Sequence, residues 1–99
     1  MLSSTQRKYL RGQAHNLKPV VMVGQKGFGP QLVSAAESAL TTHELIKVKF
    51  NEFKEKAQKQ TICDALCRAT GCELAGILGH TAIFYRAQAD PEKRKIKLP

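Results

Sequence analysis

The sequence predicts an α/β (α+β) fold, a compact domain of element order αβαβαββ with a four-stranded mixed sheet. Segments with apolar residues at helical spacing alternate with short strand-like segments, which favours a parallel strand pair joined through a helix. The last two strand-like segments are separated only by Gly79-His80, the spacing of an antiparallel hairpin. A content of 42% hydrophobic residues in 99 positions fits a single domain that spans residues 1–99.

The first predicted elements are a helix over residues 4 to 16 and a short strand. Ser3 and Gln6 have the spacing of a capping box, and the following apolar residues recur on one face of a helix. Pro19 ends this helix, because a proline has no backbone N–H to continue the ladder. The β-branched segment Val20 to Val23 then predicts a buried strand.

The middle of the chain predicts two more helices and a strand between them. Pro30 suits the first position of a helix over residues 30 to 42. Leu45 to Phe50 alternates apolar and basic residues, which indicates a half-buried strand with a basic outer face. Apolar residues at helical spacing from Ile62 onward mark a third helix, and Gly71 is a natural left-handed cap at its end.

The end of the chain predicts a hairpin followed by a polar tail. Glu73 to Leu78 and Thr81 to Arg86 are the expected strands of the hairpin. The tail from Asp90 to Pro99 is basic, and the sequence leaves open whether it is a flexible terminus or an ordered segment that touches a partner.

The charge distribution indicates a polyanionic partner. Sixteen Lys and Arg residues against eight Asp and Glu residues give a net charge of +8, and no acidic residue precedes Glu37. Nucleic acid is the leading partner, because neutralised phosphates release counterions and so favour binding without regard to sequence. An anionic membrane surface, an acidic protein or a merely solvated basic surface are the alternatives.

A glycine-framed basic loop is the strongest candidate site. Gly24, Gln25, Lys26 and Gly27 follow the predicted short strand and precede Pro30. We expect both glycines to adopt positive φ and to admit a ligand close to the backbone, while Lys26 and the next helix start hold phosphate. The structural alternative is an ordinary turn between a strand and a helix.

Other basic residues are expected to extend this phosphate-binding surface. They lie on or after the first helix and at the end of the last strand: Arg7, Arg11, His15, Lys18 and Arg86. A surface histidine is often incidental, and Arg86 has the alternative role of a charge that protects a sheet edge. Phe28 beside the loop fits an apolar anchor better than a base-stacking ring.

The sequence gives little support for catalysis or for a metal site. Cys63, Cys67, Cys72 and His80 can be drawn as a zinc site, but they lack the tight Cys-x-x-Cys spacing, and free cysteines are ordinary core residues. No nucleophile elbow, Walker loop or dinucleotide fingerprint is present. We therefore expect no enzyme activity, cofactor, metal or small-molecule substrate.

The sequence also bears on location and assembly. No apolar run approaches the roughly 20 residues that cross a bilayer, and the start Met-Leu-Ser-Ser-Thr lacks the apolar core of a secretory signal. An odd number of cysteines, three, points to free thiols in a reducing compartment. We expect a cytoplasmic monomer that does not bind membranes.

A resemblance to a known family covers nearly the whole chain. It is carried by Leu17-Lys18-Pro19-Val20-Val21, Gly24-Gln25-Lys26-Gly27, His43-Glu44-Leu45-Ile46-Lys47-Val48-Lys49, Thr70-Gly71, Ile77-Leu78-Gly79-His80-Thr81, Phe84-Tyr85-Arg86 and Arg94-Lys95-Ile96-Lys97-Leu98-Pro99. In their order and spacing, these segments resemble the stand-alone bacterial YhbY type of CRM domain, the chloroplast RNA splicing and ribosome maturation module. The chain departs from many members at Cys72, where they have a second glycine, which puts the geometry of that turn in question.

The resemblance implies a fold and a function. The fold is similar to that of the C-terminal domain of bacterial translation initiation factor three, and members act in ribosome assembly or intron splicing. The family's GxxG loop falls on Gly24 and Gly27 and looks like the nucleotide-clamping loop of KH domains. The implied partner is ribosomal RNA of a large-subunit precursor. The alternative is a protein-interaction module that binds a ribosomal protein or another acidic partner.

Overall fold

One mixed sheet organises the chain, with its four strands in the order β1-β2-β4-β3. The computed structural model describes all residues from 1 to 99. Its elements are α1 (Ser4–Ala14), β1 (Val21–Val23), α2 (Pro30–Thr42), β2 (Leu45–Phe50), α3 (Lys56–Thr70), β3 (Glu73–Leu78), β4 (Thr81–Tyr85) and the short 3-10 helix η1 (Pro91–Lys93). β1 pairs with β2 in parallel, and the other two pairings are antiparallel. The predicted αβαβαββ order and mixed sheet are therefore confirmed.

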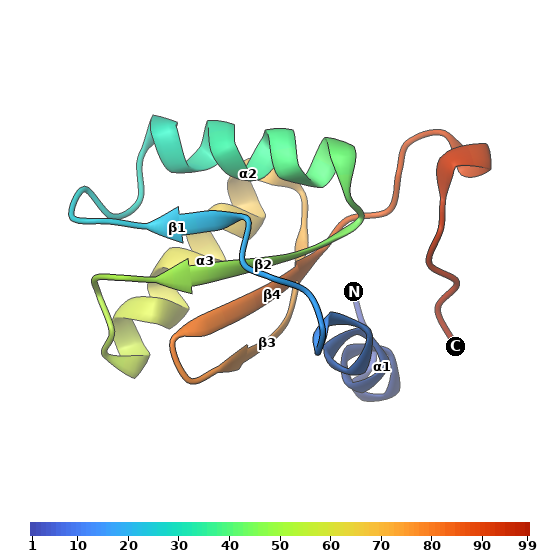
Figure 1. Ribbon diagram of the computed structural model, residues 1–99, viewed down its shortest axis with the longest axis horizontal. Helices are drawn as coiled ribbons and strands as arrows, with labels where there is room; N and C mark the ends of the chain where they lie inside the picture. Colours follow the sequence, from blue (N-terminus) through green and yellow to red (C-terminus); the bar gives the residue numbers. More distant parts are fainter.

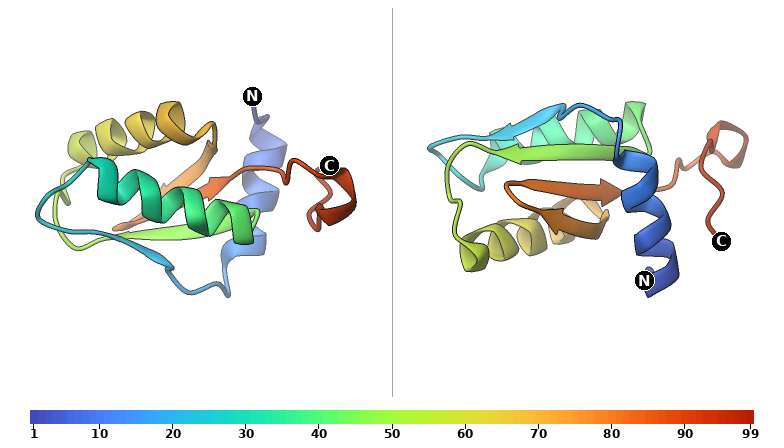
Figure 2. Two further views of the ribbon diagram at one scale, coloured as in Figure 1. Left: turned by 90° about the horizontal axis from the view of Figure 1, so that it is seen from above. Right: turned by 60° about the horizontal axis from the view of Figure 1, so that its bottom comes forward.

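The sheet separates two apolar cores. α2 and α3 cover one face, whereas α1 crosses the other face near β3 and β4 (Figures 1 and 2). β2 shows why both faces are covered: Ile46, Val48 and Phe50 point into the larger core under α2 and α3, and Leu45 points into the smaller core under α1. The predicted buried face of β2 is thus the one that packs against α2 and α3.

α1 ends two residues earlier than its sequence pattern predicts. The capping box between Ser3 and Gln6 is present, with both reciprocal hydrogen bonds formed. At the other end, the His15 N–H donates to Gly12 O at 3.2 Å and the Leu17 N–H donates to Ala14 O at 3.0 Å. These bonds close tight turns after Ala14, so the helix stops there and the chain turns toward β1.

Two predicted glycine positions take left-handed backbone conformations. Gly71 caps α3 with φ of 72° and donates its N–H to Cys67 O at 2.9 Å. Gly79, in the β3–β4 turn, has φ of 61°. These conformations confirm the expected cap of the third helix and the expected hairpin.

None of the helices combines the length and the apolar character that crossing a bilayer requires.

A buried carboxylate anchors the C-terminal segment. Glu44 is only 4% exposed, and its Oε1 accepts hydrogen bonds from the backbone N–H groups of Lys95 at 2.5 Å and Ile96 at 2.9 Å. Its Oε2 accepts from the Gln88 N–H at 3.1 Å. Burial alone would raise the pKa of Glu44, but these backbone N–H groups and the nearby Arg94 charge together lower it.

Candidate nucleic-acid interface

The loop between β1 and α2 is a tight turn in which one glycine has an unusual backbone conformation. The Gly27 N–H donates to Gly24 O at 3.0 Å and closes the turn. Gly27 lies in the left-handed region, with φ of 62°, whereas Gly24 does not have positive φ. The expectation of positive φ at both glycines is therefore wrong for Gly24, because the chain reverses at the two central residues of the turn and only Gly27, which follows them, takes the left-handed conformation.

The ring of Phe53 packs against this turn at Gly27. A Cβ atom at position 27 would lie 2.9 Å from Phe53 Cε2 and 3.0 Å from Cζ, so the ring fills the space that the glycine leaves. Phe53 itself has φ of 57°, which is rare for a bulky residue, and it packs against the larger core. Phe28 is 42% exposed, so the expectation that it anchors the loop is wrong. The anchor is Phe53, which lies in a stretch without a family motif and gave no signal in the sequence.

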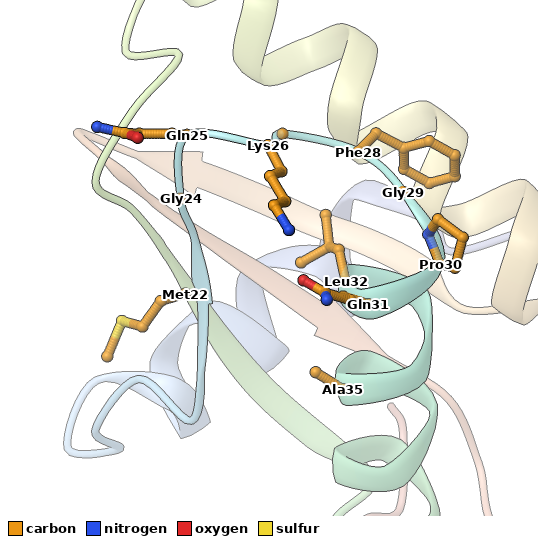
Figure 3. A pocket seen from close by; sticks show the side chains of 11 residues that line it. Met22, Gly24, Gln25, Lys26, Phe28, Gly29, Pro30, Gln31, Leu32 and Ala35 are labelled. Carbon is orange, nitrogen blue, oxygen red and sulfur yellow. The ribbon is translucent and has the colours of Figure 1, made fainter.

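The loop and the start of α2 line an open pocket of about 840 Å³. In Figure 3, Lys26 points into this pocket toward the first turn of α2, whereas Gln25 points outward. Gly29 is the N-cap of α2, and no side chain caps this end of the helix. Pro30 follows at N1, and the first turn contains no acidic residue. Free N–H groups, the positive end of the helix and an ammonium group therefore face one space, which suits an anion.

A second pocket, of about 460 Å³, lies on the other side of the loop, toward α3. Lys26, Gly27 and Phe28 border it from the loop, and Ala57, Gln58 and Thr61 border it from the first turns of α3. The exposed ring of Phe28 thus stands between two openings and is available to stack on a base.

The predicted basic residues of α1 do not lie beside the loop. Figures 1 and 2 show the loop at one end of the molecule and α1 between the sheet and the C-terminal segment, which forms the other end. Arg7 donates from Nη1 to Leu2 O at 2.8 Å, and Arg11 donates from Nη1 to Ala75 O on β3 at 2.9 Å. Both side chains border a groove across β3. His15 and Lys18 are exposed where the chain passes from α1 to β1.

Arg86 ties α2 to the end of α3. Its Nη1 atom lies 2.5 Å from Glu37 Oε2 and 2.8 Å from Thr70 O, and its Nη2 atom lies 3.3 Å from Thr41 Oγ1. It follows β4, which is an inner strand of the sheet, so the alternative that it protects a sheet edge is wrong. The structure gives Arg86 internal partners at the end of α2 remote from the loop.

The cysteines cluster at the end of α3, away from His80. Cys67 Sγ and Cys72 Sγ are 3.8 Å apart, whereas His80 Nδ1 lies 3.4 Å from Lys59 Nζ in the β3–β4 turn. No group of three or more His, Cys, Asp or Glu side chains is placed to hold a metal ion. The neighbouring Cys67 thiol lowers the pKa of Cys72, because it can donate a hydrogen bond to the Cys72 thiolate. Cys72 is buried in the larger core directly after the Gly71 cap, so the missing second glycine leaves the turn intact.

Known proteins resemble this chain over its full length. The CRS1 / YhbY (CRM) domain family matches residues 2–86. An RNA-binding protein of Haemophilus influenzae is 40% identical over 98 residues, which cover 99% of this chain and 95% of that protein. A probable RNA-binding protein of Bacillus subtilis, YqeI, is 31% identical over 99 residues, which cover 100% of each chain.

A solved structure agrees in fold as well. It is the solution structure of a hypothetical protein of Staphylococcus aureus with a proposed role in RNA binding. The two chains share a TM-score of 0.84 at 30% identity, with 100% of each chain covered. Sequence similarity and three-dimensional structure lead to the same conclusion. The chain belongs to the CRS1/YhbY (CRM) domain family.

Proposed function

We propose that this protein is a monomeric, non-catalytic RNA-binding factor of ribosome assembly. It holds ribosomal RNA of a large-subunit precursor by the phosphate backbone at the loop from Gly24 to Gly27. The observation that carries the proposal is the pocket in which Lys26 faces the uncapped start of α2. The relatives named as RNA-binding proteins support RNA as the partner. The assembly role and the large subunit come from the family resemblance.

The chemistry of the loop suits a phosphodiester group. Each backbone phosphate carries one negative charge and oxygen atoms that only accept hydrogen bonds. The N–H groups at the start of α2 donate to such oxygens, and the ammonium group of Lys26 supplies charge. Gly27 brings the backbone close to the ligand without a side chain in between. Because these contacts are made to phosphate, binding depends on the shape of the RNA more than on its sequence.

A charge reversal at Lys26 tests the loop. Lys26 is exposed and forms no hydrogen bond or ion pair within the protein, so Lys26→Glu leaves the fold intact. Lys93→Glu in η1 is the matched control, because it changes net charge equally at an exposed residue far from the loop. Fluorescence anisotropy with single-stranded ribosomal RNA fragments should show that the Lys26 variant binds more than about tenfold more weakly than the control. Equal affinity of the two variants would exclude the loop as the phosphate site.

The salt dependence of binding provides an independent measure. If about five phosphates are contacted, log K falls against log salt with a slope of about −3.5 for single strands. Lys26→Glu should make that slope shallower by about 0.7 or more, because at least one phosphate contact is lost. A flat salt response of the unaltered protein would contradict a phosphate-based mechanism.

The assembly role requires a separate experiment in cells. Gradient sedimentation of lysates at low salt should place the protein with precursors of the large subunit and not with mature ribosomes. Rising salt should release it, since the contacts are electrostatic. A position at the top of every gradient would reject the ribosomal target while leaving RNA binding to be judged by the affinity measurements.

A protein-interaction module is the second candidate, and one surface favours it. The strand register places Met22, Lys49, Thr81 and Leu78 in one row across the sheet, on the face that α1 leaves open. Met22 is 50% exposed and Leu78 is 55% exposed. An acidic protein with an apolar centre fits this row. Binding that persists at high salt and fails with the Met22→Asp variant would favour this alternative.

A further inference from the structure

A second basic site lies at a distance from the loop, in a groove across the outer edge of β3. Residues of α1 border this groove on one side and residues of α3 on the other. The right-hand view of Figure 2 shows the two helices on either side of β3. The groove has a volume of about 550 Å³. Arg7 and Arg11 enter it from α1, and Lys56 and Lys59 enter it from α3. Two helices far apart in sequence thus bring four cationic side chains to one place.

No carboxylate balances these four charges. The salt bridges within the protein join the N-terminus to Glu73 and Arg86 to Glu37, and none involves a cation of the groove. No acidic residue borders the groove. Repulsion among uncompensated like charges is unfavourable, so such a cluster gains free energy when a polyanion occupies it.

The backbone of β3 is shaped to receive Arg11. The pairing of β3 with β4 shifts register between Leu74 and Gly76, which marks a bulge at Ala75. A Cβ atom at position 76 would lie 2.7 Å from Arg11 Cδ, so only a glycine leaves room for the arginine stem. One N–H of the guanidinium is bonded to Ala75 O at 2.9 Å. Its direction is therefore fixed, and its other N–H groups stay available to a ligand.

The two lysines of α3 complement this arginine differently. Lys59 is 8% exposed, and its ammonium donates a hydrogen bond to Gly79 O in the hairpin turn. It therefore gives the groove a charge in a fixed position. Lys56 is exposed at the first position of α3 and forms no hydrogen bond or ion pair within the protein. A flexible ammonium at the rim and fixed charges within the groove suit a chain of phosphates.

We infer that this groove is a second binding site for the phosphate backbone of the same RNA that the loop holds. This inference rests on the proposed function. The first turns of α3 connect the two sites, because Ala57 and Thr61 border the pocket beside the loop while Lys56 and Gln60 border the groove. An RNA strand that crosses this helix reaches both.

The width of α3 sets the RNA length that can use both sites, because the two sites lie on either side of its first turns. A helix with its side chains is about 10–12 Å across. At about 3.4 Å per stacked nucleotide, a strand of roughly four nucleotides crosses it. An RNA of about 16 nucleotides should therefore bind far more tightly than one of about two, because joining two contacts on one strand raises the effective concentration of the second.

Lys56→Glu tests the groove with little effect on the fold. A carboxylate at the start of a helix interacts favourably with the helix dipole, so the variant is expected to fold normally. Lys93→Glu is again the matched control for net charge. With the longer RNA, Lys56→Glu should weaken binding at least threefold relative to the control and make the salt slope shallower by about 0.7. With the shorter RNA held at the loop, the two variants should bind alike.

The outcomes separate this inference from the proposed function. If Lys56→Glu matches Lys93→Glu with both RNA lengths while Lys26→Glu still weakens binding, the groove is not a phosphate site and the loop remains one. If Lys26→Glu has no effect but Lys56→Glu does, the proposed loop site fails and the groove is the site. If the unaltered protein binds neither RNA, both fail.

Discussion

Replacing Gly27 with alanine should destabilise the protein, whereas the same change at Gly24 should not. The two glycines frame one turn, and each variant adds a single methyl group. Each variant therefore serves as the control for the other. Gly27 has φ of 62°, a conformation that costs an L-residue about 1–2 kcal/mol. Gly24 does not have positive φ, and a Cβ atom there would meet nothing within 4 Å.

Contact with Phe53 adds to the cost at position 27. The new Cβ atom would lie 2.9 Å from Phe53 Cε2, well inside the favourable carbon separation of about 3.5–4.0 Å. Displacing a packed ring in this way costs about 1–3 kcal/mol. Alanine also restricts the unfolded chain, which offsets about 0.4–1 kcal/mol. We therefore expect Gly27→Ala to lower the free energy of unfolding by about 1–5 kcal/mol.

Denaturant unfolding followed by circular dichroism measures this difference. For Gly24→Ala we expect a free energy of unfolding equal to that of the unaltered protein, or higher by up to about 1 kcal/mol. The dependence on denaturant should stay the same in both variants, because each leaves the buried surface nearly unchanged. Equal stability of the two variants would refute the assignment of the strained position to Gly27 and of the anchor to Phe53.

Three other predictions concern residues outside the loop. Glu44→Gln should lower stability at neutral pH and loosen the C-terminal segment. Since the pKa of Glu44 is lower in the folded state, its contribution is present above the unfolded pKa and is lost as pH falls through the folded pKa, so acid should bring the two proteins' unfolding midpoints together. Cys67→Ala should raise the pKa of Cys72, because the thiol that stabilises the thiolate is removed; a thiolate absorbance titration that does not move would contradict this. Arg86→Ala should lower the free energy of unfolding by about 1–2 kcal/mol, since its bonds to Thr70 and Glu37 are lost. If thermal unfolding were unaffected while RNA affinity fell, Arg86 would be an RNA contact and not a structural tie.

Local sequence signals predicted most of the fold. Pro30 marks a helix start and Gly71 marks a helix end by their own backbone preferences. In the structure α2 begins at Pro30, and α3 ends at the residue before Gly71. The alternation in Leu45 to Phe50 reports which side chains are buried, because residues two apart share a face. The glycine loop was likewise evident from Gly24, Lys26 and Gly27 before Pro30, and the family resemblance identified it with the GxxG loop. Each of these signals is contained in a few consecutive residues.

The parts that the sequence did not predict depend on contacts between distant segments. Phe53 supports Gly27 although neither residue indicates the other in sequence. Arg11 lies over Gly76 because of a register shift in β3, which no periodicity reveals. The basic residues of α1 are predicted to extend the phosphate-binding surface of the loop, yet α1 packs at the other end of the sheet. Charge can be counted from the sequence, but its position depends on packing.

The parallel edge strand has a consequence for how the molecule fluctuates. β1 has three residues and pairs only with β2, whereas β2 and β4 are each paired on both sides. The end of the sheet that carries the glycine loop is thus held by the fewest ladder hydrogen bonds, and it can open while β2, β4 and β3 stay paired. Amide hydrogen exchange should be fastest there in the free protein and slowest at the β2–β4 centre. Binding of a ligand would order this loop, and the entropy lost in that ordering would lower the affinity. The same mobility would let the loop adapt its shape to an irregularly folded RNA.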